Sequence, residues 1–297
     1  MTLRSLGRHG RLTLLFATAF VAVGITAGSA SAATITFSNS AGIGIPDNKN
    51  GDPFPSTINV AGANNVQKVT ATLKGWVHSC SSDVAVLLVG PTGANTILMG
   101  QDDGGCDSGL DPVNVTFDQS ATDPVPDPLT SGTFQPTSTT DPDPFNPPAP
   151  PGPTYPVDLN VFNGASGTGA WKLFVADQVS GDTGAIFGGW SLTMTAPFNT
   201  ATLGTPTINK KKGTGRVPVT VVDSGQLTLS GKGVKSAASK SAAVGPGTVN
   251  LTVKPKGKTA KKLNDTGKAT VKVTITFTPN GGSPNSQSLK LKLKKTH

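Results

Sequence analysis

The stretch from Gly169 to Leu192 constrains the fold more than any other part of the chain. Trp171, Leu173 and Val175 recur there with the two-residue period of a strand that buries one face. A Ser-Gly-Asp-Thr-Gly run follows, and these residues favour a turn because glycine tolerates positive φ. The alternation restarts at Trp190, and each tryptophan can bury roughly 200 Å². The stretch therefore predicts a strand, a tight turn and a second strand around a hydrophobic core.

Strand and turn formers dominate the rest of the chain as well. Gly, Thr, Val, Ser and Pro are abundant, glutamate is absent, and no segment has an obvious helical pattern. The segment Asp83–Gly90 is almost wholly apolar, which predicts a strand buried on both faces. Other predicted strands are Thr34–Ser38, Thr57–Val60, Val66–Val77, Asn95–Met99, Val113–Asp118, Arg216–Val222, Gly225–Ser230, Thr248–Val253, Ala269–Thr278 and Ser288–Leu293. The sequence predicts an all-β protein.

Charge divides the chain into two modules. Residues 33–198 carry four lysines against fifteen aspartates, a net charge of −11. Residues 199–297 carry seventeen lysines and Arg216 against Asp223 and Asp265, a net charge of +16. We expect one β-sandwich in each module, because about 265 residues suit two small domains better than one.

The first 32 residues have the pattern of a secretory signal peptide. Three arginines precede an apolar run, and Ala30-Ser31-Ala32 follows it, which predicts cleavage after Ala32. A retained membrane anchor is the alternative, although the run is short and contains two glycines. We expect a secreted protein, extracellular or at the cell surface, with no transmembrane segment in the mature chain.

Several motifs in the first module resemble the P domain (P/Homo B domain), which follows the catalytic domain in kexin- and furin-like subtilisin proteases. The matching residues are Phe162, Asn163, Gly164, Gly169, Trp171, Leu173, Val175, Asp177, Gly181, Asp182, Gly184, Trp190 and Leu192. The run GWVHSCSSDVAVLLVGPTG resembles the family's paired strands, and the resemblance spans roughly residues 45–196. It implies a galactose-binding-like jelly roll, a β-sandwich that in those proteases packs on and stabilises the catalytic domain.

The chain departs from the family pattern in a proline-rich insertion at residues 137–158. Residues 123–156 hold twelve of the 24 prolines. Because proline fixes φ and removes a backbone donor, we expect an exposed, polyproline-like excursion. A passive surface loop is the simpler interpretation, and a docking site for an aromatic groove is the alternative.

Cys80 and Cys106 are the two cysteines of the chain. In an oxidising compartment such a pair favours a disulfide over a metal or redox role. The bridge would contribute roughly 3 kcal/mol to stability on the chain-entropy model.

Aspartates crowd the glycine-rich loop around Cys106. They are Asp102, Asp103, Asp107 and Asp111, with Asp118 just beyond. Hard oxygen ligands on a flexible loop suit Ca²⁺, although the spacing is not that of an EF-hand. The P-domain resemblance also implies a structural role for calcium. A solvated acidic loop is the alternative interpretation.

Residue content argues against catalysis by this chain. After the predicted cleavage site the chain retains His78 and the terminal His297, and a Ser-His-Asp hydrolase would have to use His78. We find neither a Gly-x-Ser-x-Gly elbow nor the segments of a subtilisin catalytic domain. We therefore predict no catalytic residues.

The second module resembles an immunoglobulin-like accessory domain of exported bacterial proteins. The resemblance rests on its predicted strands of alternating apolar and polar residues and on the Gly-x-Leu-x-Leu-Ser-Gly-x-Gly run at 225–233. Its lysines favour an anionic polymer as partner, such as wall polysaccharide, teichoic acid, lipid headgroups or nucleic acid. A solvated basic face, or contact with the acidic module, is the alternative. Phe277 is its single aromatic residue, which argues against sequence-specific nucleic-acid recognition.

Three functions follow for testing. The first is a secreted, non-catalytic accessory protein that binds a protein or polysaccharide at the cell surface. The second is a member or fragment of a secreted subtilisin-like serine endopeptidase. The third is a carbohydrate-binding module, which rests on fold analogy alone.

Overall fold

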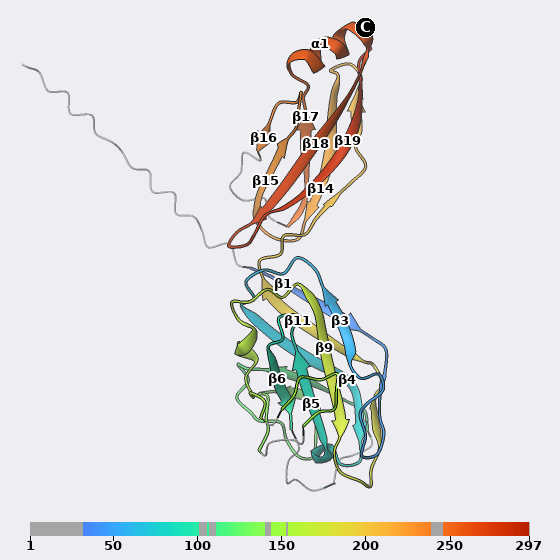
Figure 1. The fold of residues 1–297 in the computed structure, drawn as a ribbon, viewed down its shortest axis with the longest axis vertical. Helices are drawn as coiled ribbons and strands as arrows, with labels where there is room; N and C mark the ends of the chain where they lie inside the picture. Colours follow the sequence, from blue (N-terminus) through green and yellow to red (C-terminus); the bar gives the residue numbers. More distant parts are fainter. Residues whose placement is uncertain are drawn as a thin grey trace, which may run out of the picture. The chain divides into compact units, whose positions relative to one another are not determined.

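The structure is a computed structural model, and it describes residues 32–100, 106, 111–139, 144–152, 154–238 and 246–296. The predicted signal peptide lies outside these residues, except for Ala32. The described chain is nearly all β, which confirms the predicted fold class (Figure 1). Its buried apolar residues form separate clusters in residues 33–198 and 199–297, which we call the acidic and basic sandwiches. Within the described residues, no helix is long and apolar enough to cross a membrane.

The acidic sandwich contains eleven strands and two short 3₁₀ helices among its described residues. They are β1 (Ala33–Asn39), β2 (Ile43–Ile45), β3 (Ser56–Val60), β4 (Lys68–His78), η1 (Ser81–Asp83), β5 (Val84–Val89), β6 (Asn95–Met99), β7 (Val113–Asp118), β8 (Gly132–Phe134), η2 (Leu159–Phe162), β9 (Gly169–Asp177), β10 (Gly184–Ile186) and β11 (Trp190–Ala196). One sheet has the order β1-β11-β4-β10-β2, with β7 beside β4 and β8 parallel to β7. The other has the order β3-β9-β5-β6.

The stretch Gly169–Leu192 does not form a hairpin. The turn that follows β9 leads to the short β10, and β9 and β11 belong to different sheets. The strands β4 and β5, expected as a pair, likewise lie in different sheets. The alternation correctly predicted that each strand buries a face, but a period of two does not specify the partner strand.

The core of the acidic sandwich closes around the tryptophans, as predicted. Trp76, Trp171 and Trp190 are each at most 2% exposed. The Nε1 atom of Trp171 donates to the carbonyl of Gly167 (2.8 Å), and that of Trp190 donates to the Ser56 hydroxyl (3.0 Å). These bonds allow the indole N–H groups to be buried at little cost.

Part of the proline-rich insertion is buried, so the expectation of an exposed excursion is wrong there. Phe145, Ala149 and Tyr155 pack on the face of β5, β6 and β9 that points away from the other sheet. The rings of Phe145 and Tyr155 meet edge to face at 5.7 Å, and the Tyr155 hydroxyl donates to the carbonyl of Pro150. We call residues 144–152 and 154–158 the cover segment. It explains why β5 is buried on both faces: one face meets the opposite sheet and the other meets the cover segment.

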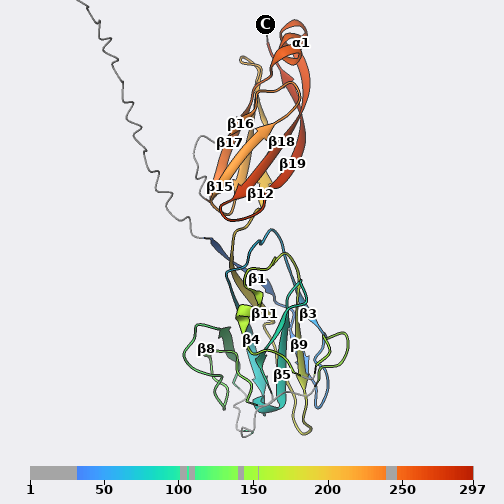
Figure 2. The same ribbon diagram turned by 60° about the vertical axis from the view of Figure 1, so that its left-hand side comes forward.

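The basic sandwich has two antiparallel sheets and a helix (Figure 2). Its elements are β12 (Ala201–Leu203), β13 (Thr207–Asn209), β14 (Thr214–Val221), β15 (Gly225–Ser230), β16 (Ala237–Ala238), β17 (Gly247–Val253), α1 (Gly257–Thr266), β18 (Lys268–Pro279) and β19 (Asn285–Lys294). One sheet has the order β12-β14-β13 with β17 also beside β14, and the other has β16-β15-β18-β19. Along β18 and β19, apolar residues face inward and lysine, threonine and serine face outward.

Helix α1 was not expected from the sequence. It buries Leu263, pairs Lys261 with Asp265 one turn later, and ends at Gly267 in the left-handed conformation (φ 69°). The Gly267 amide donates to the Leu263 carbonyl. Leu263 is the single buried apolar residue in a lysine-rich segment, so the segment shows no helical pattern of apolar residues. Gly267 at the end of the helix was a usable signal, because glycine often terminates helices.

Candidate functional site

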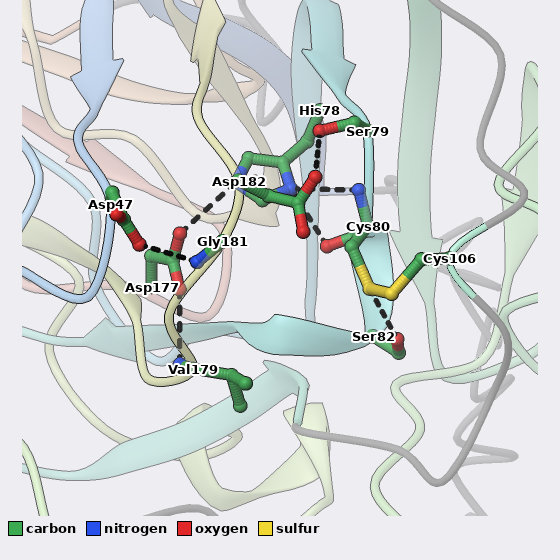
Figure 3. Close-up of a disulfide and its surroundings, with 10 residues drawn as sticks. All are labelled: Asp47, His78, Ser79, Cys80, Ser82, Cys106, Asp177, Val179, Gly181 and Asp182. Atoms are coloured by element: carbon green, nitrogen blue, oxygen red, sulfur yellow. Dashed lines mark hydrogen bonds and ion pairs between the residues drawn. A yellow bond between two sulfur atoms is a disulfide. The ribbon is translucent and has the colours of Figure 1, made fainter.

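The ends of β4 and β9 and the start of β10 bring a disulfide and several ionisable side chains together (Figure 3). Cys80 and Cys106 are joined in the disulfide predicted from the sequence. Strand β10 pairs with the end of β4, with Gly184 opposite His78. A Cβ atom on Gly184 would lie 2.2 Å from the carbonyl oxygen of Val77, so this close approach requires glycine.

His78 is fully buried and both of its ring nitrogens contact protein atoms. Its Nδ1 lies 2.7 Å from the carbonyl oxygen of Cys80 and 3.2 Å from the amide nitrogen of the same residue. Its Nε2 lies 3.3 Å from Oδ2 of Asp177. Nε2 and Oδ2 thus approach at ion-pair distance, but neither atom has a hydrogen-bond partner among the described residues.

Asp177 is 2% exposed, and its Oδ1 accepts a hydrogen bond from the Val179 amide. Burial raises the pKa of Asp177 above its ordinary value, and the Val179 amide and His78 oppose that effect. The pair of His78 and Asp177 is therefore an internal contact that holds β4 against the end of β9.

Two further carboxylates lie beside the disulfide. Carboxylate oxygens of Asp83 and Asp182 and the two sulfur atoms all lie within 4.8 Å of one another. The Ser79 hydroxyl donates to Asp182, and Asp83 is 8% exposed. Burial raises the pKa of Asp83, as do the negative charges of Asp177 and Asp182, while His78 opposes the shift. A cation would relieve this repulsion between neighbouring carboxylates.

The geometry limits what His78 can do. A general base needs a nitrogen within hydrogen-bond reach of the substrate. Nδ1 of His78 contacts the backbone of Cys80, Nε2 faces the Asp177 carboxylate, and the ring has no exposed surface. In this arrangement His78 supports the fold rather than facing a substrate.

Of the predicted calcium set, the structure describes Asp111 and Asp118, and neither belongs to the cluster beside the disulfide. Asp102, Asp103 and Asp107 lie outside the described residues, and Asp111 is exposed. Asp118 lies opposite Thr70 on β4, eight residues before His78, a separation of about 26 Å along the strand. It forms an ion pair with Lys68 (2.8 Å) and accepts hydrogen bonds from Ser120.

Sequence reasoning missed Asp83 and Asp182 as site residues. Asp83 follows Cys80 by three positions, and Asp182 lies in the Gly-Asp turn of the P-domain-like motif. The disulfide itself was the usable signal, because it fixes Cys106 beside Asp83. The pairing of β10 with β4, which places Asp182 there, had no local signal in the sequence.

The comparisons with known proteins do not assign a family. No protein-family profile and no curated protein matches this chain. Crystal structures of the Aeromonas sobria serine protease, with its chaperone and alone, match at 18% identity over 55% of this chain, with TM-scores of 0.27 and 0.26. The glycoside hydrolase domain of Endo-D from Streptococcus pneumoniae matches at 11% identity over 88% of this chain, with a TM-score of 0.20.

The matched part is 26% of the length of the Aeromonas protease chain and 33% of the Endo-D chain. With identities under 20% and TM-scores under 0.3, these similarities transfer no activity to this chain.

Proposed function

We propose that the protein is an exported binding protein whose basic sandwich holds an anionic polymer of the cell surface and whose acidic sandwich is a P-domain-like module. The observation that carries the proposal is the lack of surface compensation for the basic charge. Residues 199–297 contain eighteen cationic side chains and only two carboxylates. Asp223 is 3% exposed, and Asp265 is paired with Lys261. The excess positive charge creates an electrostatic field that attracts polyanions.

Two further observations support a binding role. The predicted signal sequence and the disulfide suit an oxidising compartment outside the cytosol. The motif residues Trp171, Trp190 and Asp177 of the P-domain resemblance are all buried, so they act in folding. The acidic sandwich thus offers its outer surface to a protein partner, as P domains do to their catalytic domains.

The proposal is tested with the mature chain, residues 33–297. Poly(glycerol phosphate) is the probe and uncharged dextran is the control polymer. We expect binding to the polyanion that weakens steeply as salt is added, because exposed charges are screened within about 8 Å near physiological ionic strength. Equal binding to dextran, or binding that salt does not change, would contradict the electrostatic account and favour the carbohydrate-binding alternative.

The competing proposal is a part of a secreted subtilisin-like serine endopeptidase. The P-domain motifs favour it, while the complete burial of His78 disfavours it. A fluorogenic-peptide assay on the purified mature chain separates the two proposals. Serine-reagent-sensitive cleavage by homogeneous protein would replace the binding proposal.

We also propose a structural calcium ion beside the disulfide. Asp83 and Asp182 are suitable donors. Burial, and then the charges of Asp177 and Asp182, raise the pKa of Asp83, and a bound cation would offset both effects. Calcium takes six to eight oxygens, so two carboxylates do not complete its shell. Aspartates of the loop around Cys106, such as the adjacent Asp107, would complete it.

A further inference from the structure

The outer face of the β13-β14-β17 sheet carries a groove of about 620 Å³ in the basic sandwich. Arg216 lies on its floor strand, β14, with Thr207 opposite on β13 and Thr252 opposite on β17. This register places one arginine between two hydroxyl side chains in a row across three strands. Lys212, in the turn between β13 and β14, and Lys254, just after β17, complete the cationic lining.

The positive charges of the groove are not neutralised by nearby carboxylates in the part of the chain that the structure describes. None of its lining residues is acidic. Among the described residues, no carboxylate lies within 4.0 Å of Arg216, Lys212 or Lys254; the ion pairs are formed by other residues. Three cations around one groove repel each other, and a bound oxyanion would offset that repulsion.

Arg216 gives the groove a chemistry that the lysines elsewhere lack. It is the one arginine of residues 33–297. A guanidinium presents a planar fork of donors that matches the two oxygens of a phosphate or carboxylate, whereas an ammonium acts as a point charge. The hydroxyls of Thr207 and Thr252 flank the fork and can donate to the same anion.

We propose that this groove, named here the Arg216 groove, binds an oxyanion group of a linear polymer that has no aromatic bases. The inference rests on the proposed polyanion-binding function and assigns it a site. The Arg216 groove has no aromatic lining, and Phe277, the one aromatic residue of the basic sandwich, is fully buried. It therefore offers no platform on which nucleobases could stack.

The test uses the mature chain and three variants, Arg216→Gln, Arg216→Lys and Lys290→Gln. Lys290 is exposed on β19, in the opposite sheet, so its variant removes one positive charge away from the groove. Binding to poly(glycerol phosphate) and to polygalacturonate is measured at low salt. Because Arg216 and Lys290 are exposed, thermal melting is expected to show intact folding in every variant.

We expect Arg216→Gln to weaken binding about tenfold or more, since a charge-assisted hydrogen bond is lost. Lys290→Gln should weaken it about twofold through the smaller net charge. Arg216→Lys should fall between them. Loss with the phosphate polymer alone, or with the uronate alone, identifies the oxyanion and supports the site in either case.

Four results would overturn the inference. Equal losses in Arg216→Gln and Lys290→Gln would mean a diffuse basic surface and would leave the proposed function standing. If the Arg216→Lys variant binds like the wild type, binding does not depend on the planar geometry of the guanidinium group. Oligothymidylate binding that is equally tight and equally dependent on Arg216 would exclude selection for a base-free polymer. If the wild type binds neither polyanion, the proposed function fails as well.

Discussion

The acidic sandwich buries ionisable groups, whereas the basic sandwich keeps nearly all of its charges outside. In the acidic sandwich His78 and Asp177 meet inside the protein, and a disulfide lies beside Asp83. In the basic sandwich the strands β18 and β19 place Lys268 opposite Lys294 and Lys272 opposite Lys290 on the outer face. Like charges directly opposite each other destabilise a sheet.

The two arrangements have different consequences for function. The ionisable groups His78 and Asp177 are buried inside the acidic sandwich, where they are out of reach of a ligand at the surface. Exposed like charges lower the stability of the fold, and a polyanion bound to them would offset that loss. This comparison is the reason why we propose a polyanion-binding surface for the basic sandwich.

The sandwiches also differ in how their sheets are covered. Strands β5, β6 and β9 are covered on one face by the opposite sheet and on the other by the cover segment. Both outer faces of the basic sandwich carry polar side chains. The difference can be measured separately in each half, because all three tryptophans lie in the acidic sandwich. Tryptophan fluorescence then reports its unfolding alone.

The largest expected effect is from removing the cover. Phe145→Ala should destabilise the acidic sandwich by about 3 kcal/mol, because the ring is 5% exposed and its loss leaves a cavity over β5. Thermal melting followed by tryptophan fluorescence measures it. The exposed Asn146→Ala in the same segment, measured in the same way, and Thr270→Ala on the outer face of β18, measured by far-ultraviolet circular dichroism, should each change stability by less than about 0.5 kcal/mol. A Phe145 variant as stable as these controls would restore the passive-loop interpretation.

The proposed calcium ion comes next. At one hundred times its Kd, calcium would stabilise the acidic sandwich by about 2.7 kcal/mol. We expect a higher melting midpoint with calcium than with chelator, and we expect Asp182→Asn to abolish the difference. Asp118→Asn is the matched control, because Asp118 lies at the other end of β4 and should leave the calcium effect intact. Identical midpoints of the wild-type chain in calcium and in chelator would remove the site.

Much of the strand content could be predicted because alternation is a local signal. Asn95–Met99, Val113–Asp118 and Gly225–Ser230 were predicted with the bounds that the structure shows. Which strands pair with one another was harder to predict from the sequence. The separation of β9 from β11 depends on partners far away in the sequence, and nothing within Gly169–Leu192 encodes it.

The cover segment and the candidate site show the same limit. Proline content predicted an irregular backbone, and much of the segment is irregular, but burial of Phe145 and Tyr155 depends on the second apolar face of β5. That face was visible in the sequence as an unbroken apolar run. Asp83 and Asp182 meet only because β10 pairs with β4. The disulfide was predictable because two cysteines allow one pairing.

The smallest expected effect compares one ion pair from each sandwich. Lys68 pairs with Asp118 at 2.8 Å, and Asp118 is 18% exposed; Lys261 pairs with Asp265 at 2.9 Å, with the two side chains 79% and 54% exposed. Burial acts to raise the pKa of Asp118, but hydrogen bonds from Lys68 and Ser120 outweigh it and hold that pKa below 3.8. The ionised form is thus favoured in the folded state.

The sign of the pH dependence follows from that shift. A lowered carboxyl pKa stabilises the fold above 3.8, and the contribution is lost as pH falls through the folded-state value. Lys68→Gln should therefore cost up to about 1 kcal/mol at pH 7, and the cost should disappear in acid, where Asp118 is protonated in both proteins. Lys261→Gln loses a helical pair worth about 0.4 kcal/mol but also relieves repulsion in a strongly basic module, so its net change should be close to zero. Fluorescence melting measures the first variant and far-ultraviolet circular dichroism the second, each at both pH values. If Lys261→Gln lowers the stability more than Lys68→Gln does, repulsion among the lysines is already compensated within the chain. That result would weaken the case that the basic sandwich requires an anionic partner.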